Sequence, residues 1–351
     1  METKQLTSLS TADDMEPMYM PSGNIVFTST RDPKYVMCNA HISANMYRME
    51  PDGANIVKIA NSTLFERPTD VMPDGRILYD RWEYNDRDFG SAQGLWTMYE
   101  DGTKQDVYYG QNYSTGATIE AKVIPGTQKV MAVISSCHDV SWGALAIIDR
   151  SNGYEGRDGV ERTWPATAIN AIAKKPSQGS IDQFKGLPVK YEDPQPLSDK
   201  YFLASRMIEN NNRKMGLYLL DVFGNETLIY ADDSASWGIF DATVLAPRAK
   251  EIASSDRRNY NDDVGTFFVQ DVYQGTHMEG VERGTVKTLR IAESLSKEFT
   301  RGQTWQGQGA QMPGVNWNSF EVKRVIGEVP VYEDGSAYFE VPQERIATSC
   351  S

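Results

Sequence analysis

Cysteine and histidine are scarce in this chain. Its 351 residues include three histidines and three cysteines, Cys38, Cys137 and Cys350. Three cysteines are too few for a disulfide framework, and none of them stands in a CxxC or CxxCH motif. The sequence therefore excludes a small disulfide-stapled fold and encodes no covalent attachment site for a c-type haem.

Positive charge and long apolar runs are also in short supply. Lysine and arginine together number 35 against 48 acidic residues, which gives a net charge of −13. The electrostatic field of this negative charge repels phosphate backbones and anionic headgroups, so we expect no nucleic-acid partner. No run of about 18 apolar residues is present to span a bilayer. The first residues lack the apolar core of a signal peptide.

The familiar catalytic motifs are missing as well. The chain has no GxSxG elbow, no phosphate-binding loop, no zinc-protease helix and no dinucleotide fingerprint. Hydrolase and nucleotide chemistry therefore have no positive support. A Ser-His-Asp triad stays open in principle, because its members converge in space and not in sequence.

What the chain does contain is a repeated strand–turn–strand pattern. The segment EPMYMPSGNIVF at 16–27 returns as RPTDVMPDGRILY at 67–79 and, more loosely, at 121–133. In these turns proline presets the first dihedral and glycine accepts a positive φ. A second hairpin with an Asp-Gly turn follows at 45–53 and at 95–102. Two hairpins make a four-stranded blade, and a strand repeat of about 45 to 50 residues is typical of a propeller.

The repeat predicts an all-β fold, a single six-bladed β-propeller of four-stranded antiparallel blades over residues 1–351. The fifth blade is expected to begin with a strand at Ala242–Leu245. A strand-like segment at Thr3–Thr7 would complete the partial sixth blade and close the ring, which removes an exposed edge. Two stretches, at about 152–189 and 294–319, are predicted insertions. The strand-like start and abrupt end are also consistent with a piece of a larger protein.

All three histidines fall in long loops that the repeat places on one face of the disc. His41, His138 and His277 belong to alternate blades, and Cys38 and Cys137 stand beside the first two. Alternate blades approach the central axis from three directions, so the three imidazoles could meet there and bind zinc, copper or iron. The alternative is that the histidines are scattered on a polar surface, where each binds water or a neighbouring carboxylate.

A dense charged and aromatic cluster follows one strand of the second blade. The segment RWEYNDRD at 81–88 holds two arginines, three acids and two aromatic residues. Arg81, Trp82, Tyr84 and Arg87 are candidates for gripping an anionic ligand. The commoner outcome for such a cluster is a network of ion pairs and stacked rings that orders its own loop.

Five segments carry a resemblance to known propellers. They are NMYRMEPDGANI (45–56), PDGRILYDRWEYNDR (73–87), GLYLLDVFGN (216–225), DVYQGTHMEGVERGTVKTLRI (271–291) and VIGEVPVYEDGSAYFEVP (325–342). They resemble the TolB-like propeller repeat and, in particular, the middle domain of the hydrazine synthase alpha subunit. The resemblance implies a six-bladed propeller within a larger exported protein, periplasmic or extracellular, whose haem-bearing segments supply the redox chemistry. Because this chain lacks CxxCH, no haem ligand is carried over.

Two classes of function fit these features. The leading hypothesis is a binding or scaffold module that presents its long loops to a ligand, a metal, or another domain or subunit. The alternative is a metal-dependent or redox enzyme with His41, His138 and His277 at the propeller mouth, where Arg81 and Tyr84 orient a substrate. The enzyme requires the three histidines within a few ångströms of a common point, whereas the scaffold predicts them apart.

Overall fold

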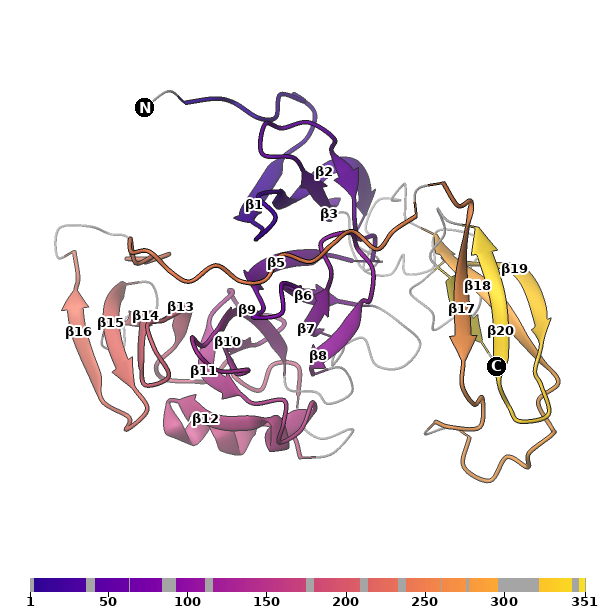
Figure 1. Ribbon diagram of the computed structural model, residues 1–351. Coiled ribbons are helices and arrows are strands. Elements are labelled where there is room, and N and C mark those ends of the chain that lie inside the picture. Colours follow the sequence, from indigo (N-terminus) through magenta and orange to yellow (C-terminus); the bar gives the residue numbers. More distant parts are fainter. Residues whose placement is uncertain are drawn as a thin grey trace, which may run out of the picture. The chain divides into compact units, whose positions relative to one another are not determined.

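The computed structural model describes most of the chain, namely residues 3–35, 42–62, 64–83, 93–110, 116–174, 180–208, 214–232, 238–259, 261–275, 278–295, 322–342 and 347–350. Regular structure in these segments is almost entirely antiparallel β-sheet, with two short 3-10 helices (Figure 1). The predicted all-β class is thereby confirmed. No described helix is long and apolar enough to cross a membrane.

The chain divides into two compact units, the first formed by Met1–Pro33 with Ala44–Asp256 and the second by Lys34–Ser43 with Arg257–Ser351. The first four-stranded sheet runs in the order β1 (Asp14–Tyr19), β2 (Ile25–Tyr35), β3 (Ile42–Met49) and β4 (Val57–Lys58). The second sheet runs in the order β5 (Glu66–Val71), β6 (Ile77–Trp82), β7 (Gln93–Met98) and β8 (Asp106–Tyr109). Both sheets reproduce the two hairpins that the turn signals predict.

Two further groups of four strands share one larger sheet. The third group is β9 (Ala117–Val123), β10 (Val130–Ser135), β11 (Gly143–Ile148) and β12 (Val160–Trp164). The fourth group is β13 (Tyr191–Pro196), β14 (Tyr201–Met207), β15 (Met215–Asp221) and β16 (Glu226–Tyr230). They are joined by a single pairing, between Gly143 and Tyr191.

The stretch predicted as the first insertion supplies part of the third group. It contains β12 and the 3-10 helices η1 (Gly156–Gly159) and η2 (Ala166–Ala171), and its residues 175–179 lie outside the described residues. Strand β12 is hard to predict from sequence, because its five residues VERTW do not alternate between apolar and polar. The strand is identified only by its antiparallel pairing with β11.

Within the first unit, successive groups of strands pack face to face, with a core between each pair. Side chains of β10 alternate between two cores: Ala132 and Ile134 face the second sheet's Leu78 and Leu95, whereas Val133 faces the core that contains Phe202 of the fourth group. Because strand side chains alternate with a period of two, a strand buried on both faces is apolar throughout. This stacking is of the propeller type.

Residues 238–256, here called the strap, follow β16 without regular structure. The expected strand at Ala242–Leu245 is therefore wrong: this apolar run is extended but has no ladder partner among the described residues. The strap passes the inner strand β5 in Figure 1. One end is fixed where Ile239 N–H donates to the Met215 carbonyl at 3.0 Å.

The N-terminal segment Thr3–Thr7 is described in the structure and does not form a β-strand. Lys4 Nζ donates to the Asp52 carbonyl at 2.9 Å, and Leu6 packs against the core of the first sheet around Phe27 and Tyr47. Thr3–Thr7 therefore lies against a turn and a sheet face instead of extending a ladder, and the predicted ring closure is not confirmed.

The second unit consists of two small antiparallel sheets. One pairs β17 (Val264–Val269) with β20 (Ala337–Pro342), and the other runs β19 (Val322–Pro330), β18 (Thr288–Leu295), β21 (Ala347–Cys350). Leu289, Ile291 and Phe339 belong to its own buried cluster. Of the predicted insertion at 294–319, all but the first two residues lie outside the described part. A single six-bladed ring over residues 1–351 stays a prediction.

Candidate functional site

The structure describes only part of the predicted metal and ligand cluster. His138, Cys137, Arg81 and Trp82 are described, whereas Cys38, His41, His277, Tyr84 and Arg87 lie outside the described residues. Within the described segments, no three His, Cys, Asp or Glu side chains are grouped so that they could hold one metal ion. The metal site at the three histidines stays a prediction.

His138 is paired with an aspartate. Its Nδ1 lies 2.8 Å from Asp182 Oδ2, and its backbone N–H donates to Asp182 Oδ1 at 2.9 Å. Burial, which raises the pKa of Asp182, is outweighed by these hydrogen bonds, so that pKa lies below its ordinary value. The imidazole is 57% exposed. A surface histidine paired with a carboxylate is what the alternative to the metal site describes for this residue.

Arg81, at the end of β6, is held by contacts within its own sheet. Its guanidinium lies 3.2 Å from Glu66 and 2.6 Å from Glu83, and it donates to Gln105 Oε1 at 2.8 Å. The same group lies 4.5 Å from the ring centroid of Trp96. These contacts favour the ordering network over an anion site at this arginine.

The arrangement around Arg81 recurs in other sheets. Arg31 in β2 pairs with Asp14 at 2.8 Å and lies 5.2 Å from the ring centroid of Tyr47. Arg206 in β14 lies 4.6 Å from the ring of Tyr218. A cation on the second strand that covers an aromatic ring of the third strand is thus a repeated feature of the fold.

A different set of side chains converges along the inner strands. Consecutive inner strands β1, β5, β9 and β13 are neighbours, and each has a register shift near its middle. At three of these shifts an acidic residue has a positive φ: Glu16 (54°), Glu120 (56°) and Asp193 (52°). Asp241 in the strap has the same conformation, with φ 53°. Bulges re-aim the side chains they carry, and the three bulge acids and Asp241 line one space.

That space is a cavity of about 370 Å³, here called the inner-strand cavity. The charged residues of its described lining are the four acids above and two cations, Arg67 and Lys122. The Arg67 guanidinium is 2.7 Å from Asp80 and 3.8 Å from Glu120, and the Lys122 ammonium donates to the Thr69 carbonyl. Both cations are therefore engaged by the protein, and the acids outnumber them.

The electrostatics of the cavity follow from this imbalance. Burial raises the pKa of Glu120 to about 7, with Asp193 adding to the rise and Arg67 opposing it. Burial likewise raises the pKa of Glu192 to about 8, with Glu120, Asp193 and Asp241 as the neighbouring negative charges. Groups whose pKa values are shifted so far towards neutrality are common at functional sites.

Hydrogen bonds connect the acids to the strap. Glu120 Oε2 accepts the backbone N–H of Asp193 at 3.1 Å. Asp193 Oδ2 in turn accepts the backbone N–H of Asp241 at 2.9 Å and the Ser205 hydroxyl at 3.1 Å. The position of the strap therefore depends on the acids of the cavity.

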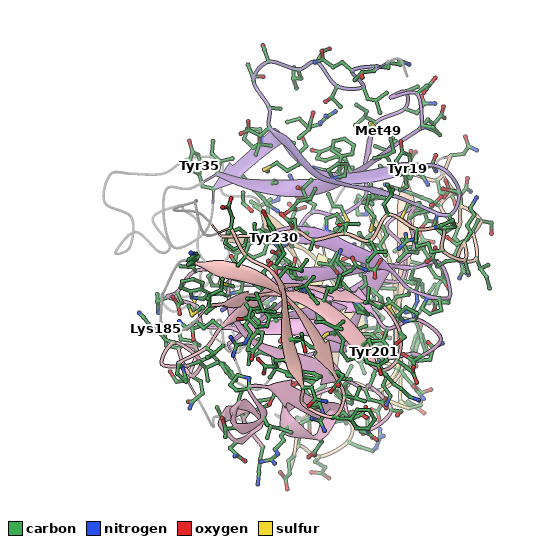
Figure 2. The ribbon with its side chains drawn as sticks, turned by 90° about the vertical axis from the view of Figure 1, so that its left-hand side faces the viewer. Tyr19, Tyr35, Met49, Lys185, Tyr201 and Tyr230 are labelled. Carbon is green, nitrogen blue, oxygen red and sulfur yellow. The ribbon has the colours of Figure 1, made fainter. Side chains whose placement is uncertain are left out.

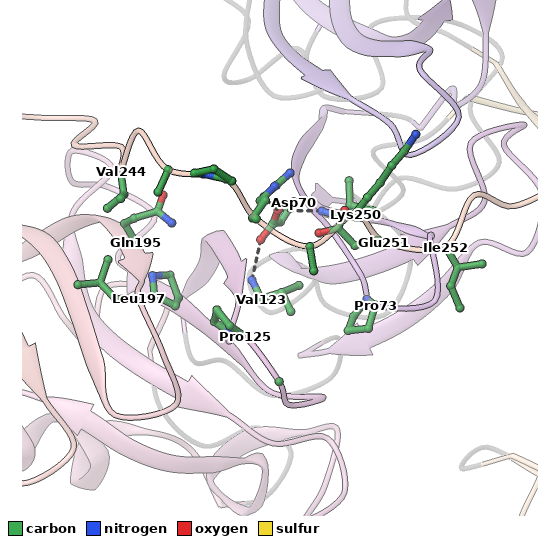
Figure 3. A pocket seen from close by; sticks show the side chains of 17 residues that line it. Asp70, Pro73, Val123, Pro125, Gln195, Leu197, Val244, Lys250, Glu251 and Ile252 are labelled. Atoms are coloured by element: carbon green, nitrogen blue, oxygen red, sulfur yellow. Dashed lines mark hydrogen bonds and ion pairs between the residues drawn. The ribbon is translucent and has the colours of Figure 1, made fainter.

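A second cavity of about 490 Å³, here called the strap cavity, lies between the strap and the ends of β5, β9 and β13 (Figure 3). Its walls include Val123, Pro125 and Leu197. Asp70 accepts the backbone N–H of Val123 at 2.8 Å, and burial raises its pKa.

This chain resembles known proteins in sequence and in structure. Residues 284–349 match the family model described as the hydrazine synthase alpha subunit middle domain. A solved structure of Kuenenia stuttgartiensis hydrazine synthase is similar with a TM-score of 0.69 at 16% identity, and the match covers 99% of this chain and 54% of that one. A putative TolB from Agrobacterium tumefaciens matches at a TM-score of 0.39 and 12% identity, over 61% of this chain and 64% of that one. No curated protein matches the chain.

The family-model match and the hydrazine synthase structure confirm the resemblance that the sequence segments carry. At 16% identity the likeness to hydrazine synthase shows the fold alone. The chain spans about half the length of the hydrazine synthase chain that it matches.

Proposed function

We propose that this chain is a propeller-type binding module of a larger protein, and that its inner-strand cavity binds a small organic cation. The observation that carries the proposal is the convergence of Glu16, Glu120, Asp193 and Asp241 on a cavity whose described cations are already paired. Four acids against two cations leave an excess of negative charge in a partly buried site, and a positively charged ligand stabilises such an excess.

An ammonium or guanidinium group suits this cavity better than a metal ion. The acids come from different strands, and no three of the described ligating side chains are grouped closely enough to coordinate one ion. An organic cation makes fewer demands, because each N–H group donates to a separate carboxylate over a wider span. The volume of about 370 Å³ is that of a small-molecule site.

The surrounding protein belongs to the same proposal. Hydrazine synthase resembles this chain over only 54% of its own length, so a similar module here would adjoin another domain or subunit. From the same resemblance we propose a periplasmic or extracellular protein, and we expect six blades.

Calorimetric titration with methylammonium and guanidinium chloride tests the proposed ligand. We expect saturable binding that weakens about tenfold or more in Glu120→Gln, which removes one charge at constant shape. Glu161→Gln is the matched control, since Glu161 is an exposed acid of β12 that pairs with Lys129 outside the cavity. Absence of binding, or equal affinity in both variants, would contradict the proposal.

A further inference from the structure

We propose that the ligand has an apolar body that occupies the strap cavity, so that the ligand class is an alkyl or aryl amine and not a bare ammonium ion. This inference rests on the proposed function, which supplies the site for the charged head. It goes further by assigning a role to a second cavity on the same strands.

The two cavities follow one another along the same three inner strands. Thr69, Lys122 and Gln195 line the inner-strand cavity, while Asp70, Val123 and again Gln195 line the strap cavity. Neighbouring positions on β5 and β9 therefore face one cavity and then the next, and Gln195 on β13 faces both. A molecule whose head lies among the acids has its continuation directed towards the strap cavity.

The chemistry of the lining changes along this path. Six of the 14 residues that line the inner-strand cavity are charged, whereas the walls of the strap cavity are largely aliphatic and proline side chains, among them Val123, Pro125, Leu197 and Val244. Its volume of about 490 Å³ is within the usual range for organic ligands. Apolar walls of this kind stabilise a hydrocarbon body by removing it from water.

Four charged residues also line the strap cavity, the acids Asp70 and Glu251 and the cations Arg248 and Lys250. Asp70 lies within the cavity, and its one charged partner on the strap, Arg248, is 3.9 Å away with a side chain that is 67% exposed. Figure 3 shows the Lys250 side chain directed away from Pro73 and Pro125. Because the two acids and two cations balance and Lys122 also acts on Asp70, the lining suits an uncharged apolar body.

The test is a titration series with methylammonium, propylammonium and pentylammonium chloride at one pH and ionic strength. Burial of each added methylene in the strap cavity is expected to tighten binding roughly fourfold. Leu197→Trp fills the cavity, so it should abolish the dependence on chain length while leaving methylammonium affinity unchanged. Leu228→Trp is the control, because Leu228 is equally exposed on β16 and lines neither cavity.

The outcomes separate this inference from the proposed function. If methylammonium binds and longer amines bind no more tightly, the inference is overturned and the proposed function stands. If no ammonium ion binds, both are overturned. Should Leu197→Trp fail to fold, Val244→Trp fills the same cavity from the strap. A dependence on chain length that persists with the cavity filled also overturns the inference.

Discussion

Glu120 connects the backbone conformation of this protein to its chemistry. Its positive φ at the bulge of β9 turns the carboxylate towards Arg67 and Asp193, and burial there brings its pKa to about 7. A non-glycine residue in this conformation costs of the order of 1 kcal/mol. The same cost recurs at Glu16 and Asp193, and backbone strain of this kind clusters at binding and active sites.

The raised pKa values predict how stability depends on pH. Glu120 and Glu192 have an ordinary pKa of 4.5 and folded values of about 7 and about 8, so folding favours their protonated forms. Their stabilising effect is complete below about pH 4.5 and is lost as pH rises through 7 to 8. We expect the free energy of unfolding to fall by roughly 2 kcal/mol between pH 5.5 and 8.5, after allowance for partial solvent access.

Urea denaturation across that pH range measures this effect. Glu192→Gln should flatten the decline, because an amide has no proton to lose. Glu161→Gln, which changes an exposed acid, should keep the slope of the wild type. An unfolding free energy that rises between pH 5.5 and 8.5 would show that these carboxyls are not protonated in the folded protein.

Arg81 illustrates a charged residue with a structural role. Glu66 is almost fully buried and faces Arg81, so removing the guanidinium leaves a buried charge without its partner. Arg81→Ala is therefore expected to lower the free energy of unfolding by about 3 kcal/mol and to leave ammonium affinity unchanged. Denaturation and titration of the same sample measure both. Retained stability with lost ligand binding would instead assign Arg81 to a ligand site.

At the scale of single elements, the hairpins were predictable because their signals are local. The turns at Gly23 and Gly75 follow a proline, and both glycines have the positive φ that the Pro-x-Gly pattern requires. Strand pairing is not local, and this explains the errors at Thr3–Thr7 and Ala242–Leu245. Both segments have extended, strand-like sequences, but the ladder that would make them strands depends on residues far away in the chain.

The candidate site was missed for a related reason. A β-bulge adds one residue without a compositional signature, so the sequence does not reveal that Glu16, Glu120 and Asp193 share a side of the sheets. The one available signal was spacing: Glu16 and Glu120 each stand five residues before a turn proline, Pro21 and Pro125. The sequence instead predicts a site at the histidine loops, because imidazole is a common metal ligand.

The strap packs closely against the turn at Gly75. A Cβ at this position would lie 2.0 Å from the Ile252 carbonyl oxygen, and φ is +83°. Gly75→Ala should therefore displace the strap, weaken pentylammonium binding and speed tryptic cleavage after Arg248 and Lys250 by several-fold. Gly23→Ala is the matched control, since it imposes the same backbone strain at the equivalent turn of the first sheet but meets only Pro51, at 3.8 Å.

Cleavage rates and product masses from a time course distinguish the two variants. Equal acceleration in Gly75→Ala and Gly23→Ala would mean that backbone strain, and not the contact with Ile252, loosens the strap. Unchanged rates in both would mean that the strap is held by other contacts, such as the hydrogen bond from Asp241 to Asp193.

At the scale of the whole molecule, the negative net charge agrees with cation binding. A net charge of −13 raises the local concentration of cations around the protein, and added salt should weaken ammonium binding. Figure 2 shows the outer strands of the fourth group, with Tyr201 and Tyr230 labelled, and both tyrosines are about half exposed.

The central claim is that an organic cation binds among carboxylates that hold protons near neutral pH. The most direct measurement is methylammonium titration at pH 7 in two buffers of different ionisation enthalpy, which counts the protons released. We predict release of a substantial fraction of a proton by the wild type, and a clearly smaller release by Glu120→Gln. Binding without proton release, at an affinity that Glu120→Gln leaves unchanged, would contradict the account.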